Sequence, residues 1–244
     1  MSTLATRKIE PLSGTTVTLG EAGDTVAVPT GGIVKTNTVK DAGGNTLLTS
    51  DGAGTFSSVN SQLKGNMTWV ASQTASDVVS VEFTNLSTTY DSYEFYYVNI
   101  NPSTDSAEFG FQTSVNPVKY GYGIIKTTTA FSAQHSEGGS GSMGYESSYD
   151  LAQATDMQWL ANSVGSGDDE SASGCLKLFN PTSPTFVKHF YARTSYYHKN
   201  DVAMDLFIGG YVNQPNTAMQ ALSAIKFMVD TGTMTGTIHM YGIL

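Results

Sequence analysis

Segments in which apolar and polar residues alternate one by one recur through most of this chain. Val79, Val81 and Phe83, for example, are separated by polar residues. Alternation with a period of two places the apolar side chains on one face of an extended strand and the polar side chains on the other. Clusters of Asn, Asp, Ser, Gly and Pro separate these segments, as the turns between antiparallel strands require. The pattern therefore predicts an all-β fold.

Most of these segments lie after residue 66. Strands are expected at residues 67–73, 79–83, 93–100, 108–112, 176–178, 186–195, 203–212, 225–229 and 236–242. Residues 148–160 have Leu151, Ala154 and Leu160 in partial helical register but lack an apolar stripe, so a loop or a strand is expected there. This succession of antiparallel strands without helical periodicity predicts a jelly-roll-like β-sandwich of two sheets.

The composition changes near residue 66. Phe56 is the only aromatic residue before this point, although the chain contains 13 Tyr, 11 Phe and 2 Trp residues. Basic and acidic residues balance before residue 66, so the whole formal charge of -9 belongs to the rest of the chain. We expect two domains, residues 1–66 and residues 67–244, and the second has the acidic surface.

The first of these domains contains short alternating segments rich in Gly and Thr. Residues 16–19 and 25–28 repeat one pattern, and further strands are expected at residues 33–39 and 46–49 with glycine-rich turns around them. Strands this short have an apolar face that one small chain cannot bury, so stacking against identical copies around an axis is favoured. We infer a trimeric β-stalk that anchors the chain, with a loosely ordered linker as the alternative.

The charge and the single cysteine exclude several classes of function. A pI near 4.7 argues against nucleic acid as a partner, because phosphate binding needs a basic stripe. Cys175 has no second cysteine for a disulfide and is expected to be a small buried hydrophobe. No signal peptide and no long apolar run is recognised, so we expect a protein made in a cytoplasm without membrane insertion.

No residue pattern indicates a catalytic site, a metal site or a cofactor. Residues 168–170, Asp-Asp-Glu, supply oxygen ligands for calcium but lack the alternating spacing of a calcium loop, so a solvated hairpin tip is favoured. The four histidines are scattered. Residues 131–139 contain serine, histidine and glutamate, but a catalytic triad is assembled from separate elements of a fold. We expect a protein that is not an enzyme.

Clusters of aromatic and polar residues are the best candidates for a binding surface. Exposed rings with nearby hydrogen-bonding groups are common where a protein meets a carbohydrate or protein receptor. The candidate receptor-binding residues are Tyr120, Tyr122, Tyr145, Tyr149, Tyr196 and Tyr197. Each cluster also fits the plain edge of a β-sandwich, so both interpretations stay open.

Several short motifs follow one another in order along the chain. Two of them are TWVASQTAS at residues 68–76 and GTIHMYGI at residues 236–243. The others lie at residues 9–20, 85–93, 99–105, 178–181, 186–190 and 209–211. Together they resemble a widespread group of virion proteins of tailed bacteriophages, many of them marine. The resemblance implies a homotrimer on the outside of the particle, with an anchoring N-terminal part and a projecting β-sandwich head.

Three functional hypotheses follow. The first is a homotrimeric fibre that docks on other virion proteins, of the tail or the capsid, through residues 1–66 and contacts a glycan or protein of the host cell surface through its head. The second is a capsid decoration or head-fibre protein without a specific receptor. The third is a particle-borne polysaccharide depolymerase, which is disfavoured because such enzymes need long grooves with paired carboxylates.

Overall fold

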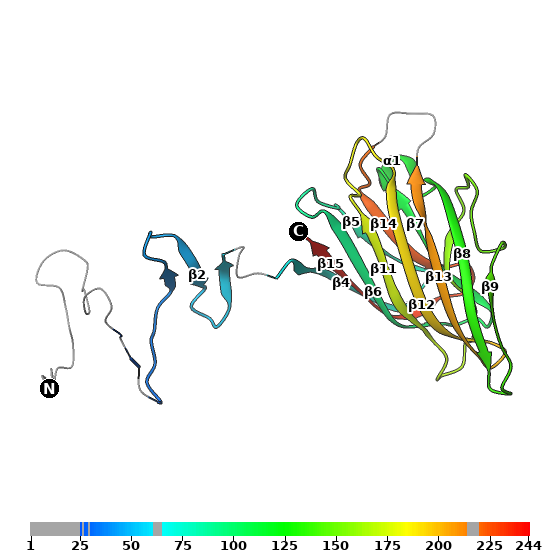
Figure 1. Ribbon diagram of the computed structural model, residues 1–244, viewed down its shortest axis with the longest axis horizontal. Coiled ribbons are helices and arrows are strands. Elements are labelled where there is room, and N and C mark those ends of the chain that lie inside the picture. The colour runs from blue at the N-terminus through cyan, green and yellow to red at the C-terminus, as the bar shows by residue number, and fades with distance from the viewer. Residues whose placement is uncertain (1–24, 26, 29, 61–64, 214–219) are drawn as a thin grey trace, which may run out of the picture. The chain divides into compact units, whose positions relative to one another are not determined.

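The computed structural model describes residues 25, 27–28, 30–60, 65–213 and 220–244. The chain divides into two units, residues 1–63 and 64–244. Regular structure in the described residues is antiparallel β-sheet, apart from one short helix, α1 (Pro117–Tyr120) (Figure 1). The predicted all-β class is confirmed.

The described part of the first unit is a three-stranded antiparallel sheet. Its strands, in spatial order, are β1 (Thr38–Lys40), β2 (Thr46–Ser50) and β3 (Phe56–Val59). Asp41 Oδ1 accepts a hydrogen bond from Asn45 N at 2.8 Å, and Asp51 Oδ1 accepts one from Ala53 N at 2.7 Å, so an aspartate closes each turn. No described side chain of this unit is fully buried.

The strands expected in this unit are only partly present. β2 lies at the strand expected over residues 46–49, whereas the one expected over residues 33–39 begins only at Thr38. Residues 16–19 lie outside the described residues. Of residues 25–28, those that are described have no regular structure.

The described part of the second unit contains twelve strands. They are β4 (Met67–Val78), β5 (Ser80–Thr84), β6 (Ser92–Pro102), β7 (Ala107–Ser114), β8 (Ile125–Ser136), β9 (Gly141–Tyr145), β10 (Gln158–Val164), β11 (Ala172–Phe179), β12 (Lys188–His198), β13 (Val202–Asn213), β14 (Ala224–Val229) and β15 (Met234–Ile243).

These strands form two layers of a jelly-roll-like sandwich. The larger layer has the order β4-β15-β6-β11-β12-β13-β8-β9, and Figure 1 shows β6, β11, β12, β13 and β8 side by side. The smaller layer has the order β5-β14-β7-β10. The layers are joined at one side where the chain passes from β4 to β5, and at the other by the pairing of Val164 in β10 with His198 in β12. The sandwich is thereby nearly closed.

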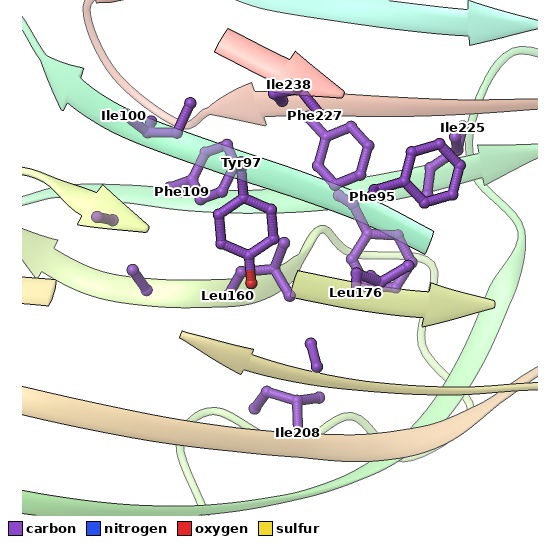
Figure 2. Packing of buried hydrophobic residues seen from close by; sticks show 14 of the residues in the cluster. Phe95, Tyr97, Ile100, Phe109, Leu160, Leu176, Ile208, Ile225, Phe227 and Ile238 are labelled. Atoms are coloured by element: carbon purple, nitrogen blue, oxygen red, sulfur yellow. The ribbon is translucent and has the colours of Figure 1, made fainter. Parts of the chain in front are cut away.

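Aromatic rings fill the space between the layers around Phe227 of β14. Phe227 is fully buried, and its ring centroid lies 5.4 Å from that of Phe95 in the larger layer (Figure 2). Its ring neighbours are Phe83 (6.2 Å), Phe95 (5.4 Å), Tyr97 (6.3 Å), Phe109 (6.2 Å) and Phe111 (6.4 Å). Large rings that leave water together contribute both area burial and edge-to-face attraction. Phe227 therefore ties β5, β7 and β14 to β6.

Three strands of this unit are missing from the sequence-based expectation: β8, β9 and β10. The inward positions of β8 include Lys126, Thr128 and Ser132, which are buried although they are polar. β9 is exposed along its whole length. Neither strand therefore shows the alternation of apolar and polar residues on which strand prediction depends. No helix forms over residues 148–160, in agreement with the expectation, and β10 begins at Gln158.

Two lysines are fully buried in β12 and β8, the strands on either side of β13. Lys188 in β12 is paired with Val212 in β13, which in turn is paired with Lys126 in β8. Lys126 Nζ donates a hydrogen bond to the Ile124 carbonyl at 2.9 Å, and burial lowers the pKa of Lys126 to about 8. Among the residues that the structure describes, Lys188 Nζ has no hydrogen-bond partner, and burial also lowers the pKa of Lys188. An unpaired buried ammonium is costly, so we expect Lys188 to lower the stability of the fold.

Phe227→Ala is expected to reduce the free energy of unfolding by about 3 to 5 kcal/mol, because it leaves a cavity that five other rings line. Chemical denaturation followed by circular dichroism measures this change. Phe131→Ala, which removes a ring that is 46% exposed, is the control and should cost about 1 kcal/mol or less. Equal losses for the two variants would contradict the central place of Phe227.

Lys188→Met is expected to raise the free energy of unfolding at pH 7 by about 1 to 3 kcal/mol, because it removes an unsatisfied buried group. The pKa of Lys188 is lowered in the folded protein, so the unfolded chain binds more protons and stability rises with pH toward the ordinary pKa of 10.5. The gain from the substitution should therefore be smaller at pH 10 than at pH 7, as denaturation at both pH values would show. Lys177→Met is the control, and it should bring no gain because the ammonium of Lys177 is partly exposed and is paired with Glu94.

Candidate functional site

An open cleft of about 390 Å³ lies where the segment after β9 meets β10 and the residue that follows β14. It is lined by Ser148, Tyr149, Asp150, Leu151, Asp156, Met157, Trp159 and Asp230. We call these eight residues the acidic cleft. Among the described residues, its lining has three aspartates and two aromatic rings, and neither lysine nor arginine.

The polar inward residues of β8 hold one wall of the acidic cleft in place. Thr128 N donates to the Leu151 carbonyl, and Leu151 N donates to Thr128 Oγ1, both at 2.8 Å. Thr128 Oγ1 in turn donates to Gln158 Oε1 at 2.7 Å, and both side chains are buried. Lys126 N donates to the Ala154 carbonyl at 2.8 Å. Residues 151–154 are therefore attached to β8 as an irregular edge strand.

Two half-buried aromatic rings form the apolar part of the cleft. The rings of Tyr149 and Trp159 meet edge to face, with centroids 5.5 Å apart. The Tyr149 hydroxyl donates a hydrogen bond to Asn162 Oδ1 at 3.0 Å. Asn162 and Trp159 both belong to β10, so one strand positions both rings.

The three aspartates differ in how far their carboxylates are already engaged. Asp150 accepts a hydrogen bond from the Tyr145 hydroxyl. Asp230 Oδ1 accepts one from Glu108 N at 2.7 Å, while Asp230 N donates to the Glu108 carbonyl at 3.1 Å. Asp156 is exposed, and of the three it has the most freedom to meet a ligand.

Glu108 of β7 lies behind the lining of the cleft. Its Oε2 accepts hydrogen bonds from Asn162 Nδ2 at 2.7 Å and from Ser163 N at 3.3 Å. Burial, which outweighs these two hydrogen bonds, raises the pKa of Glu108 to about 7, and the charge of Asp230 acts in the same direction. Glu108 is thus a carboxyl group that changes charge near neutral pH.

This combination of groups suits a neutral ligand with many hydroxyls. The C–H face of a sugar ring packs against an aromatic ring, and carboxylates accept hydrogen bonds from sugar hydroxyls. The absence of a cation from the described lining disfavours phosphate or carboxylate ligands, which would meet three negative charges.

The six tyrosines predicted to bind a receptor do not share one surface in the structure. Tyr149 lines the acidic cleft, and Tyr145, which is 59% exposed, hydrogen-bonds to a lining residue. Tyr122 is half-buried beneath Lys226, whose Nζ lies 4.6 Å from the ring centroid. The Tyr120 side chain lies outside the described residues.

The expectation of an exposed ring is wrong for Tyr196, which is only 4% exposed. Tyr196 and Tyr197 are successive residues of β12, so their side chains point to opposite faces, and the first is directed into the core. The Tyr197 hydroxyl is within 3.1 Å of Glu137 and of Asp201, to which it is hydrogen-bonded.

Sequence reasoning missed Trp159, Asp156, Asp230 and Glu108. Trp159 is one of only two tryptophans and follows Asp156 closely, which is a signal that a search for an aromatic residue beside a carboxylate would find. Asp230 and Glu108 join the site only through the pairing of β7 with β10 and β14, which no local pattern reports.

A second surface lies on the outer side of the larger layer. Cross-strand neighbours there form a row from Tyr145 through Phe131 and Phe207 to Arg193. The rings of Phe131 and Phe207 are stacked with centroids 4.7 Å apart, and the Arg193 guanidinium lies 4.9 Å from the Phe207 centroid. We call this surface the outer aromatic face. Its other exposed rings are Trp69, Tyr96 and Tyr191.

The charges of the outer aromatic face are paired with one another. Arg193 forms an ion pair with Asp205 at 2.5 Å, and Lys177 forms one with Glu94 at 2.9 Å. The face is therefore apolar and close to neutral in a unit that is otherwise acidic.

The remaining polar clusters show no metal-binding geometry. Within residues 25–60, 65–213 and 220–244, as far as these are described, no group of three His, Cys, Asp or Glu side chains is arranged to hold a metal ion. In the acidic loop at residues 168–170, Glu170 Oε2 accepts a hydrogen bond from Gly167 N at 2.5 Å. Cys175 is partly buried, and burial raises its pKa to about 11.

In the described residues no helix is long and apolar enough to span a membrane.

Comparisons with protein-family models, with curated proteins and with solved structures find no match to this chain.

Proposed function

We propose that this chain is a structural protein of a tailed-phage particle, a homotrimeric fibre whose second unit binds a glycan of the host cell surface in the acidic cleft. The phage assignment rests on the resemblance of its sequence motifs to virion fibre and decoration proteins. The binding role rests on one observation, the meeting of Trp159 and Tyr149 with three carboxylates in an open cleft.

A binding role is supported over a catalytic one by how the carboxylates are used. Asp150 and Asp230 already accept hydrogen bonds from Tyr145 and from Glu108 N, and Glu108 is not among the lining residues. A glycosidase needs one carboxyl group to donate a proton and a second to act as nucleophile or base at the same bond. Incubation of the purified protein with host polysaccharide should leave the chain length of the polymer unchanged, and shortening would favour a depolymerase.

The two units suit different parts of such a fibre. The small sheet of the first unit leaves its described side chains exposed or half-exposed, which is the condition under which stacking of identical chains is favourable. The outer aromatic face offers a neutral, apolar surface in the second unit. The three heads of one homotrimer would bind a repetitive glycan with high avidity, even if each cleft binds weakly.

The proposed site is tested by Trp159→Ala. Loss of the ring should weaken binding to immobilised oligosaccharides about tenfold, which corresponds to about 1.4 kcal/mol. An array of neutral, amino and acidic oligosaccharides measures binding, and the acidic ones should bind least because they meet three carboxylates. Tyr191→Ala, which removes a ring that is 54% exposed on the outer aromatic face, is the control and should bind like the unsubstituted protein. A loss of oligosaccharide binding in Tyr191→Ala alone would show that the binding site lies on the outer aromatic face and not in the acidic cleft.

The oligomeric state is tested by light scattering on the purified full chain. A homotrimer has three times the chain mass of 25.9 kDa, whereas a value near the chain mass would contradict the trimer. Electron microscopy of the particle then distinguishes a fibre on the tail from a decoration on the capsid, because a capsid position would remove the tail-fibre interpretation.

A further inference from the structure

A continuous chain of hydrogen bonds connects Glu108 to the rings of the acidic cleft. Asn162 Nδ2 donates to Glu108 Oε2 at 2.7 Å, and Asn162 Oδ1 accepts from the Tyr149 hydroxyl at 3.0 Å. The Tyr149 ring then meets the Trp159 ring at a centroid distance of 5.5 Å. Each link joins residues that are wholly or partly buried.

The amide of Asn162 can transmit a change in charge because its two ends have opposite roles. Its NH₂ group only donates hydrogen bonds and its oxygen only accepts them. A charged Glu108 accepts strongly, so it orients the NH₂ group toward itself and the oxygen toward Tyr149. A neutral Glu108 loses this charge-assisted bond, and the restraint on Asn162 and Tyr149 becomes weaker.

We propose that Glu108 is a positioning residue whose charge determines, through Asn162, how firmly Tyr149 and Trp159 are held at the acidic cleft. The part of this inference that concerns ligand affinity rests on the proposed glycan-binding function: the cleft binds more tightly when Glu108 is charged. The part that concerns the positions of the rings does not depend on any ligand.

The groups around Glu108 place its change of charge near neutral pH. Burial raises the pKa of Glu108 to about 7, and the facing charge of Asp230 adds to this, while Lys199 acts in the opposite direction. Tyr149 and Tyr196 also face it: burial raises the pKa of each tyrosine, and the charge of Glu108 adds a smaller contribution in the same direction. Glu108 is therefore mainly neutral at pH 6 and mainly charged at pH 8, so the rings are held more firmly at pH 8.

Tryptophan fluorescence tests the positioning directly. The chain has two tryptophans, so in a Trp69→Phe background the emission reports on Trp159 alone. We expect the emission of this protein to change between pH 5 and pH 9 with a midpoint near 7. Glu108→Gln, which keeps the shape of the side chain but cannot become charged, should abolish this transition. Glu82→Gln, at an exposed position of β5, is the matched control and should retain it.

A second variant separates coupling from folding defects. Tyr149→Phe removes only the hydroxyl that contacts Asn162, and it should also abolish or strongly reduce the transition seen by Trp159. If the midpoint near 7 persists in Glu108→Gln, another group causes it, and if the full transition persists in Tyr149→Phe, it does not pass through Asn162; either result overturns the proposal.

Ligand affinity is measured with the oligosaccharide that binds best on the array. We expect affinity to be about three- to tenfold weaker at pH 6 than at pH 8, as for the loss of one hydrogen bond, and this difference should vanish in Glu108→Gln. If no oligosaccharide binds, the proposed function fails, whereas the fluorescence transition still decides the positioning role. A pH dependence of affinity that is equal in Glu108→Gln would overturn the inference.

Discussion

Contact between aromatic rings across the two layers is the interaction on which the second unit depends. Phe227 lies between the layers and touches rings from β5, β6 and β7. Two residues of the acidic cleft, Trp159 and Asp230, and Glu108 behind the cleft are direct sequence neighbours of core residues. Glu108 precedes Phe109, Trp159 precedes Leu160 and Asp230 follows Val229, and each of the three core residues is buried. Because a strand alternates its side chains between faces, fixing the core residue also fixes its neighbour, so the packing around Phe227 positions the cleft.

The alternation of apolar and polar residues predicted those strands whose inward side is apolar, such as β5 and β14, and it failed where the inward side is polar. Thr128 of β8 is buried because Gln158 and the backbone of Leu151 satisfy its hydroxyl, and such partners lie too far along the chain for any local pattern. For the candidate site, too, the sequence predicts only those residues that a local pattern indicates. Tyr149 was predicted from a local cluster, whereas Asp230 reaches the cleft only through strand pairing. The error at Tyr196 was avoidable, since two adjacent tyrosines in one strand cannot both face solvent when one face is core.

The acidic cleft and the outer aromatic face differ in whether their charged side chains form ion pairs. Among the described residues, the carboxylates of the acidic cleft form no ion pair, whereas each charge on the outer aromatic face has an ion-pair partner within that face. Burial of a face against another protein is costly when it carries unpaired charge, but a solvated cleft bears such charge at little cost. The outer face is therefore the better surface for contact with protein, and the cleft is the better surface for a small hydroxylated ligand that keeps part of its hydration.

The pairing of β4 with β15 has a consequence for how this protein is made. These are the first and last strands described in the second unit, and they pair from Met67 opposite Ile243 to Val78 opposite Met234, with two shifts of register between these ends. β6 also needs β15 as its other neighbour. The larger layer is thus incomplete until residues 234–243 have left the ribosome, and pairings this distant in sequence form slowly. Until then the edge of β6 is open to strands of other nascent chains, so chains synthesised close together on one messenger are at risk of pairing wrongly at that edge.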